Sequence, residues 1–433
     1  MAISLPLSSD DAIRRTVQQM PAGYWDFVSA DTKEWTHGYH SYPAMMIPQI
    51  ARSFIQVIKR NRPGIGTLFD PFMGSGTSLV EGLLAGLSVS GSDLNPLSRL
   101  LAFTKTTAWD PDVLQYWMDA VASHVSALTV SEADWPTFDH LTFWFKPVVI
   151  ADLSRLKRSI ATVVPAPVQP FFWVAFSDTV RWVSNSRNTE FKLYRLDAPR
   201  LAQWNPDVLA AFRRVMARNQ LGNARLWRRQ PLPPVSLHAF NAMDLSALPA
   251  DHFDVMVTSP PYGDSRTTVA YGQFSRLSLQ WLDLEDAATS PAPNRLDQAL
   301  LGGQAAKGPA AIPPSPTLQA ALNQISSRDA VRAVQVLAFY QDLDRTLGEI
   351  ARVMRPDSYQ CWVVGNRTVK KIQLLTDRII IELGARYGLV PVTTVTRTIP
   401  NKRMPKENSP TNQPGNKMAT MNGEQLFILR KMP

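Results

Sequence analysis

The sequence predicts an α/β fold with a Rossmann-like, seven-stranded and mostly parallel sheet that is interrupted by a mainly helical insertion. Short apolar strands alternate with helical patterns toward both ends of the chain. Residues 105–235 break this alternation, because they are rich in Trp, Arg and Pro and mostly helical in pattern. We therefore divide the chain into residues 1–104, the inserted region 105–235, and residues 236–433, which complete the sheet.

The first strand–helix–strand unit is predicted in residues 67–93. Residues 46–60 precede it with apolar side chains at helical spacing, and the sequence RNRPGIG then ends that helix. TLFDPF, which starts the unit, predicts a short buried strand, and GSGTS predicts a tight turn. LVEGLLAG predicts a helix that ends at Gly86. LSVSGSD then predicts a second strand with an acid at its end.

Regular alternation resumes after the insertion. The further strands are predicted at residues 235–244, 252–259, 359–366, 390–399 and 425–431, with helices at 330–354 and 374–388. The last two strands are close enough in sequence to pair antiparallel. Residues 287–317 are rich in Ala, Pro and Gly, so we expect a mobile loop or linker there.

The net charge of +9 is concentrated in two segments. Residues 146–229 hold 15 Lys and Arg against five Asp and Glu, and residues 397–431 hold seven against two. Such a surplus is typical of a surface that binds a polyanion, although a solvated basic face is the alternative.

The remaining composition narrows the class of protein. The single cysteine, Cys361, excludes a disulfide framework and a cysteine-rich zinc site. Neither a signal-peptide pattern nor an apolar run of membrane-spanning length occurs. We expect a cytoplasmic protein without a metal or a membrane partner.

The turn at residues 70–77, DPFMGSGT, is suited to an anionic or nucleotide ligand. Gly74 and Gly76 let the backbone approach a ligand closely, and N–H groups are free at the start of the following helix. Asp93 follows Gly74 by 19 residues at a strand end, where a carboxylate can accept hydrogen bonds from both ribose hydroxyls. The P-loop pattern is missing, and Leu79 replaces the third glycine of the dinucleotide fingerprint. An adenosine cofactor is therefore predicted.

Asp244 ends the strand predicted at residues 235–244. At that position its carboxylate is a candidate partner for the adenine amino group of the cofactor. A helix N-cap before LSALP is the alternative.

The second candidate site is Ser259-Pro260-Pro261-Tyr262, at the end of the strand predicted at residues 252–259. Two consecutive prolines end the strand and fix a rigid loop at the carboxyl edge of the sheet, with carbonyl groups pointing outward. Tyr262 offers a face on which a planar ring can stack. An ordinary loop is the alternative for this motif taken alone.

Together these segments resemble the bacterial amino-methyltransferases of restriction–modification systems, particularly the cytosine-N4 group. DPFMGSGTS and GSDLNP are similar to that family's cofactor motifs, and TSPPYG to its catalytic motif with serine leading. HSYPAMMIP is similar to the segment that these enzymes place over the methionine part of the cofactor. The resemblance implies a class I S-adenosylmethionine methyltransferase fold. It also implies S-adenosylmethionine as cofactor and double-stranded DNA as partner, and leaves open a cognate restriction endonuclease.

The resemblance also implies roles for individual residues. The target-base pocket would be formed by Ser259, Pro260, Pro261 and Tyr262. The cofactor pocket would be formed by His40, Tyr42, Pro43, Asp70, Phe72, Gly74, Ser75, Gly76, Thr77, Asp93 and Asn95. A serine oxygen and a proline carbonyl would draw both N–H bonds of a base amino group out of the ring plane, which concentrates the lone pair on nitrogen. The base must first be rotated out of the duplex.

The region that contacts DNA is assigned from charge and composition, because the motif order is opposite to that of many serine-type members. Residues 146–229 combine the basic surplus with the aromatic residues Phe171, Phe172, Trp173, Trp182, Tyr194, Trp204 and Trp227. A core position is the alternative for each aromatic residue singly. We predict DNA contacts for Arg181, Arg187, Lys192 and Arg195, and for Lys402 and Arg403 between the last two strands.

Three other functions stay open at this stage. Adenine-N6 methylation uses the same chemistry, and relatives of that type more often carry Asp or Asn at the position of Ser259, so serine favours cytosine. Methylation of an RNA amino group is the second. A non-catalytic nucleic-acid-binding module on a methyltransferase fold is the third, and the intact residues of both half-sites argue against it.

Overall fold

The computed structural model describes residues 8–188, 191–264, 268–282, 284, 291–304, 311–399, 407–408, 418–419 and 423–433. Among them, seven strands form one sheet in the order β3-β2-β1-β4-β5-β11-β8. Their bounds are β1 (Thr67–Asp70), β2 (Ser88–Ser92), β3 (Val235–His238), β4 (Phe253–Thr258), β5 (Met354–Val364), β8 (Leu389–Thr398) and β11 (Gly423–Lys431). Neighbours from β3 to β5 pair in parallel, and β11 runs antiparallel to β5 and β8. The predicted Rossmann-like sheet is confirmed, including its antiparallel last pair.

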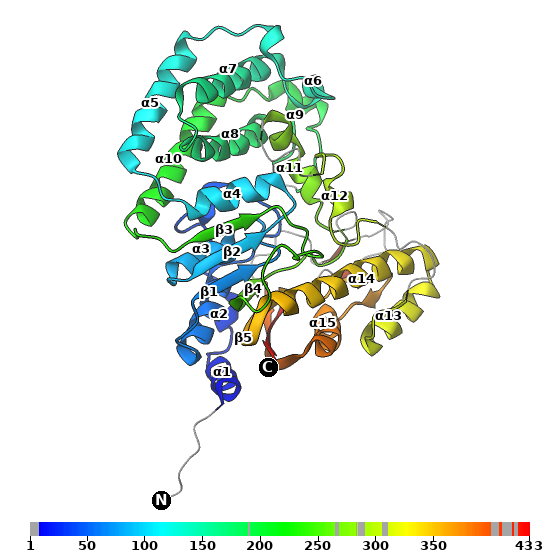
Figure 1. The fold of residues 1–433 in the computed structure, drawn as a ribbon. Coiled ribbons are helices and arrows are strands. Elements are labelled where there is room, and N and C mark those ends of the chain that lie inside the picture. Colours follow the sequence, from blue (N-terminus) through cyan, green and yellow to red (C-terminus); the bar gives the residue numbers. More distant parts are fainter. Residues whose placement is uncertain are drawn as a thin grey trace, which may run out of the picture.

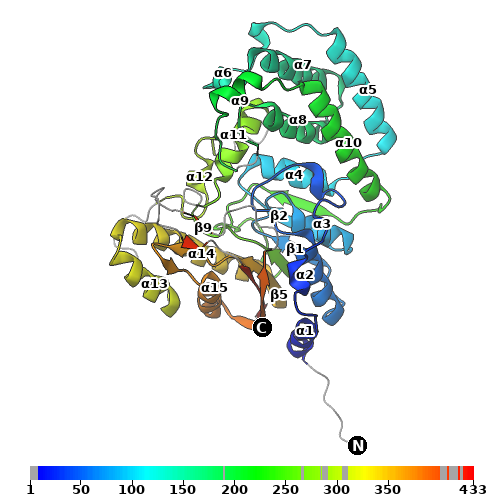
Figure 2. The same ribbon diagram turned by 180° about the vertical axis from the view of Figure 1, so that it is seen from behind.

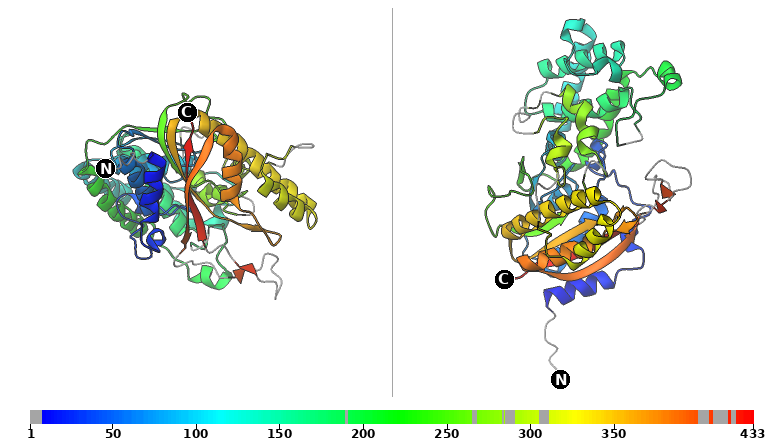
Figure 3. Two further views of the ribbon diagram at one scale, coloured as in Figure 1. Left: turned by 90° about the horizontal axis from the view of Figure 1, so that it is seen from below. Right: turned by 90° about the vertical axis from the view of Figure 1, so that its right-hand side faces the viewer.

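Helices cover both faces of this sheet (Figures 1 and 3). One face carries α1 (Ser9–Gln18), α2 (Pro48–Asn61) and α3 (Thr77–Leu84), and the other carries α13 (Pro316–Ser326), α14 (Ala330–Val353) and α15 (Thr376–Gly384). Successive strand residues point to opposite faces, so Leu68 and Cys361 enter the first core while Phe69 and Trp362 enter the second. Burial on both faces explains why the central strands carry apolar residues at successive positions, as in Leu68-Phe69 and Cys361-Trp362.

The inserted region forms a helical layer at one side of the sheet (Figures 1 and 2). It consists of α5 (Pro111–Ala127), α6 (Leu141–Trp144), α7 (Pro147–Val163), α8 (Gln169–Val183), α9 (Ala198–Gln203) and α10 (Val208–Trp227). Its core also includes Leu97 of α4 (Pro96–Thr106) and Phe274, Leu277 and Trp281 of α11 (Tyr271–Trp281). The helix that follows the Ser-Pro-Pro-Tyr motif is therefore packed into the inserted layer.

Residues 291–304, within the segment 287–317 that we expect to be a mobile loop or linker, include a helix and a buried leucine. They contain α12 (Leu296–Ala299), and Leu301 is buried in the core beside α14. Two backbone N–H groups at the start of α11 donate to the Asp297 carboxylate at 3.0 and 3.2 Å. This segment is therefore attached to α11, while residues 285–290 and 305–310 lie outside the described part of the chain.

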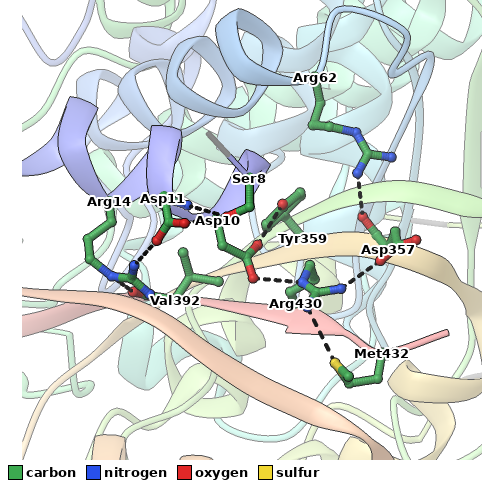
Figure 4. Close-up of polar contacts among 10 residues, drawn as sticks. All are labelled: Ser8, Asp10, Asp11, Arg14, Arg62, Asp357, Tyr359, Val392, Arg430 and Met432. Carbon is green, nitrogen blue, oxygen red and sulfur yellow. Dashed lines mark hydrogen bonds and ion pairs between the residues drawn. The ribbon is translucent and has the colours of Figure 1, made fainter. Parts of the chain in front are cut away.

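The N-terminal helix α1 is attached to β5 and β11 of the sheet (Figure 4). Asp10 accepts hydrogen bonds from the Tyr359 hydroxyl at 2.8 Å and from Arg430 Nε at 2.9 Å. Arg430 also donates to Asp357 at 2.6 Å. These contacts lie toward the amino ends of the parallel strands, so they leave the opposite edge of the sheet open for a site.

Two further findings concern the described residues alone. None of their helices combines the length and apolar character needed to cross a bilayer. In the same ranges, no three His, Cys, Asp or Glu side chains are grouped as ligands for a metal ion.

Candidate active site

The two predicted half-sites meet at one edge of the sheet. β1 and β4 are parallel neighbours, with Leu68 opposite Val255, so the turns that follow them emerge side by side. The Thr258 hydroxyl at the end of β4 donates to Asp70 Oδ1 at the end of β1, at 2.6 Å. This hydrogen bond joins the glycine turn directly to the strand that carries the Ser-Pro-Pro-Tyr motif.

Asp70 is the centre of this junction. Its buried carboxylate also accepts from the Phe72 N–H at 3.0 Å and from the Ser78 hydroxyl of α3. Burial raises the pKa of Asp70 to about 6. Because strand, turn and helix all donate to this one carboxylate, Asp70 sets the geometry of the turn.

The glycine turn needs its glycines. Gly76 has φ +82°, and a Cβ there would lie 2.9 Å from Ala102 Cα of α4. Gly74 has φ +48°, and the Tyr42 ring lies 3.6 Å from the position of its missing Cβ. Both glycines therefore adopt left-handed backbone conformations that other residues rarely adopt. The Tyr42 ring, in the segment 40–48 that carried the resemblance, lies against the turn.

Asp93 lies directly after β2 and faces the same turn. Its carboxylate accepts from the Gly74 N–H at 3.1 Å and from the Asn95 N–H at 2.8 Å. The surrounding protein excludes water, which raises the pKa of Asp93 to about 6. A carboxylate has about four acceptor positions, so Asp93 retains capacity for ligand hydroxyl groups.

These elements line one cavity with an empty volume of about 870 Å³. Of the predicted residues, it is lined by Tyr42, Pro43, Asp70, Phe72, Gly74, Ser75, Thr77, Asp93, Asn95, Ser259 and Pro261. The Ser75 hydroxyl is buried and finds no hydrogen-bond partner among the described residues. A buried hydroxyl of this kind is available to a bound ligand.

The sequence did not indicate several other residues of the lining. They are Ala44, Met45, Met46, Pro71, Met73, Leu94, Phe240, Asn241, Ala242, Tyr271, Leu300 and Leu301. The lining residues that adjoin the motifs in sequence could have been predicted from that position alone. Leu300 and Leu301 lie in the Ala/Pro/Gly-rich segment and carried no such signal.

Asp244 and His40 do not line the cavity. Asp244 is exposed and accepts from the N–H and hydroxyl of Ser246 at 3.1 and 2.6 Å, so the prediction of a cofactor contact is not supported. The residues that follow it form turns and no helix, so the N-cap alternative does not fit either. His40 is buried against α8, where Nε2 pairs with the Ser177 hydroxyl at 2.9 Å. Desolvation lowers the pKa of His40. It anchors the segment over the turn to the inserted layer.

Gly76, Pro260 and Tyr262 belong to the same two turns but do not line the cavity. The Ser259 hydroxyl donates to the Tyr262 hydroxyl at 3.3 Å, and Tyr262 donates to Glu424 Oε1 at 2.8 Å. Glu424 Oε2 in turn accepts from Arg397 at 2.8 Å. Burial, with a further contribution from the Glu424 charge, raises the pKa of Tyr262.

Asn95 lines the cavity, but its side chain is bound to other parts of the protein. The side-chain amide donates to the Tyr42 hydroxyl at 3.1 Å and to Ser275 at 2.8 Å, while its oxygen caps α4. Asn95 thus holds Tyr42 over the glycine turn and links it to α11.

No family model matches the chain. It is 46% identical over 428 residues to type II methyltransferase M.MvaI of Kocuria varians, covering 94% of this chain and 93% of that protein. The chain belongs to the type II DNA methyltransferases of restriction–modification systems. Its cofactor is therefore S-adenosylmethionine, and DNA is the substrate class. Type II methyltransferase M.MjaII of Methanocaldococcus jannaschii is 37% identical over 91 residues, 20% of this chain and 17% of that protein.

Solved structures overlap with this methyltransferase more distantly. The rRNA methyltransferase aviRa of Streptomyces viridochromogenes matches with a TM-score of 0.34 and 13% identity, covering 97% of this chain and 96% of that one. A putative DNA modification methylase of Thermus thermophilus matches with a TM-score of 0.22 and 15% identity over 44% and 50% of the two chains. At such scores the order of the strands, rather than these overlaps, identifies the fold.

The residues predicted to contact DNA differ in their exposure to solvent. The prediction for Arg181 is not supported, because this side chain is buried with its guanidinium carbon 3.9 Å from the centre of the Phe274 ring. Arg187, Lys192 and Arg195 are partly exposed in the segment after α8. Lys402 and Arg403 lie outside the described residues.

We expect the Asp70 junction to depend on pH. Thr258→Val keeps the side-chain shape but removes one donor from a buried carboxylate, so the free energy of unfolding at pH 8 should fall by about 1–3 kcal/mol. The loss should shrink at pH 5, because the raised pKa of Asp70, about 6, leaves the carboxyl protonated in the folded state there. Urea unfolding at both pH values measures this.

A matched control for that substitution is Thr346→Val. Thr346 is also fully buried, but its hydroxyl donates to the backbone carbonyl of Asp342 at 2.9 Å. Its loss should be the same at both pH values. An equally pH-independent loss for Thr258→Val would contradict the role given to Asp70.

Proposed function

We propose that this methyltransferase transfers a methyl group to the N4 amino group of cytosine in double-stranded DNA, after the base has rotated out of the duplex. The observation that carries the proposal is the shared cavity, which brings the glycine turn and Ser259 together. Bacterial host DNA in the cytoplasm would be its substrate, and a cognate restriction endonuclease would cut the same site when it is unmodified.

The chain would act by orienting the amino group rather than by a strong base. Ser259 lines the cavity, and the carbonyl of Pro260 follows it in a loop that Pro261 stiffens. We assign the two N–H groups of the target amine to these two oxygens, which would leave the nitrogen lone pair directed at the cofactor. When bound, S-adenosylmethionine supplies an electrophilic methyl group on its sulfonium sulfur. Tyr262 would support the extruded ring.

The cofactor side of the cavity fits an adenosyl group. Asp93 would accept hydrogen bonds from the ribose hydroxyls, and Ser75 Oγ would bond to a polar group of the methionine part. Tyr42, Pro43 and Phe72 would contact it through their apolar surfaces. Adenine-N6 transfer is the alternative target, and serine at position 259 is the observation that favours cytosine.

We further propose that the inserted region 105–235 recognises the DNA, chiefly through the segment after α8. The Arg187 N–H donates to the Tyr194 carbonyl at 2.8 Å and the Leu196 N–H donates to the Asn185 carbonyl at 2.8 Å, so residues 185–188 lie alongside residues 191–196 and together are called the loop after α8. Leu193 donates to Gln273 of α11 at 3.3 Å, and α11 begins at Tyr271 in the cavity lining. The loop is thereby held beside the cavity.

This loop carries the chemistry of a DNA-contacting surface. Phe191 and Tyr194 are 49% and 47% exposed, a large apolar area for a surface position. Arg187, Lys192 and Arg195 add positive charge around them. Exposed aromatic rings among basic side chains suit stacking or wedging against bases and contact with phosphates.

The test of the chemistry is modified-base sequencing of DNA from a host that expresses the chain and lacks N4-methylcytosine of its own. We expect N4-methylcytosine in one recurring sequence context. Ser259→Ala should lower the methylation rate by about 100-fold, as expected for loss of one positioning hydrogen bond at the reacting group. N6-methyladenine in place of N4-methylcytosine would contradict the choice of base, and neither mark would contradict the activity.

Asp93 provides a test of the cofactor side. Asp93→Asn should raise the dissociation constant for S-adenosylmethionine roughly tenfold or more at pH 8, from ~1.5–3 kcal/mol of lost hydrogen bonding. For the unsubstituted protein the constant should rise as the pH falls through about 6, the raised pKa of Asp93, because the protonated carboxyl accepts fewer hydrogen bonds. The variant should show little of this dependence.

Calorimetry at pH 5 and pH 8 measures both effects. Asp344→Asn is the control, since Asp344 pairs with Arg386 at 3.0 Å on the α14–α15 side of the sheet. A Kd for Asp93→Asn equal to that of the unsubstituted protein would remove Asp93 from the cofactor site.

The role of the loop in DNA binding can be tested by the salt dependence of the binding constant. Arg187→Ala and Lys192→Ala should each weaken DNA binding and lower the slope of log K against log salt by about 1, because one phosphate contact releases about one counterion. Arg158→Ala on α7, where Arg158 pairs with Asp134 at 2.9 Å, makes the same charge change elsewhere in the inserted layer. Fluorescence anisotropy across a salt series would refute the assignment by giving all three variants the same slope.

A further inference from the structure

The structure assigns to Glu424 a role as a positioning residue for the proposed methyl transfer to an amino group. We propose that Glu424, acting through Tyr262, fixes the direction of the hydrogen bonds at Ser259 so that the serine oxygen presents only acceptor positions to the cavity. This inference rests on the proposed function and adds the reason why an amino group would be selected over a carbonyl group.

The direction follows from what each group can donate. An ionised carboxylate has no proton to donate, so the 2.8 Å contact between Tyr262 and Glu424 Oε1 uses the tyrosine proton. The tyrosine oxygen is then left to accept, and it receives the proton of Ser259 Oγ at 3.3 Å. Ser259 has a single proton, so the part of its oxygen that faces the cavity can only accept.

Arg397 keeps the hydrogen bonds from Ser259 through Tyr262 to Glu424 in one direction. Its guanidinium is 2% exposed and donates to Glu424 Oε2 at 2.8 Å. Arg397 Nε and Nη2 find no hydrogen-bond partner in the described ranges. The Glu424 carboxylate is the counterion of this buried cation, and removing it would be strongly unfavourable. The ion pair therefore holds Glu424 in place as the acceptor for Tyr262.

The sheet itself holds the pair in register. Glu424 on β11 lies directly opposite Arg397 on β8 in their antiparallel ladder. β11 also pairs with β5, the neighbour of β4, whose end carries Ser259. The antiparallel strand pair at the end of the chain thus reaches back to the catalytic motif, although 162 residues separate Tyr262 from Glu424.

The consequence is selectivity at the reacting atom. A serine whose proton is free can rotate to accept from an amino group or to donate to a carbonyl oxygen. A serine whose proton is committed to Tyr262 can pair with the amino group but meets a carbonyl oxygen with its own lone pairs. Cytosine should therefore bind better than its 4-oxo analogue, uracil, at the target position.

The experiment compares duplexes that carry cytosine or uracil at the target position found by sequencing, using the full chain with S-adenosylhomocysteine. Glu424→Gln conserves size but gives the side chain an amide that can donate to Tyr262. The direction of the hydrogen bonds among Ser259, Tyr262 and residue 424 can then reverse. We expect the preference for cytosine to fall roughly tenfold, which corresponds to one hydrogen bond. We also expect a lower kcat with an unchanged Kd for S-adenosylmethionine.

Tyr262→Phe is the second variant, because it removes the middle hydroxyl while keeping the ring and the Arg397–Glu424 ion pair. It should lose the same preference even where Glu424→Gln folds poorly. Gln425→Ala is the control on the same strand, since the Gln425 side chain accepts from Thr396 at 2.9 Å on the exposed surface of the β8–β11 pair. It should keep both preference and kcat.

The outcomes separate the two claims. A protein that methylates DNA and prefers cytosine, but keeps that preference in Glu424→Gln and Tyr262→Phe, overturns the role of Glu424 and leaves the proposed function standing. Wild-type protein that leaves no methylated cytosine overturns the proposed function and this inference together.

Discussion

The site depends on one hydrogen bond between two strand ends, from the Thr258 hydroxyl to the Asp70 carboxylate at 2.6 Å. A parallel sheet brings the carboxyl ends of β1 and β4 to one edge, but it does not fix the turns that follow them. Asp70 does so by accepting from β4, from its own turn and from α3 at once. The buried charge is costly, as its raised pKa shows. The gain is a rigid boundary between the cofactor side and the base side of the cavity.

Segments that are distant in sequence from the Asp70 junction also enclose the cavity. The inserted layer contributes α11 and, through Asn95 and Ser275, holds Tyr42 over the glycine turn. Segment 291–304 adds Leu300 and Leu301 to the lining. The same α11 anchors the exposed loop after α8. The surface that we assign to DNA and the cavity that we assign to chemistry are therefore built on one helix, which provides a direct structural route from recognition to catalysis.

Features set by short stretches of sequence could be predicted. The strands alternate with helices in the expected order, and the turns at 70–77 and 259–262 lie where apolar runs end. Features set by packing between distant residues could not. Arg181 is indistinguishable in sequence from an exposed arginine, yet it lies over Phe274. Glu424 meets Tyr262 only because β11 inserts between β5 and β8. Asp244 was misplaced because β3 ends at His238, six residues before it.

We infer that cofactor and target base enter one cavity from opposite sides of the Asp70 junction. A crystal structure of the protein with S-adenosylhomocysteine and a duplex containing the target site tests it most directly. We expect the cofactor sulfur beside the glycine turn and the target amino nitrogen at Ser259, separated by little more than a near-attack distance of about 3–3.5 Å plus one bond. An extruded base bound away from Ser259, or a cofactor bound away from Gly74, would contradict it.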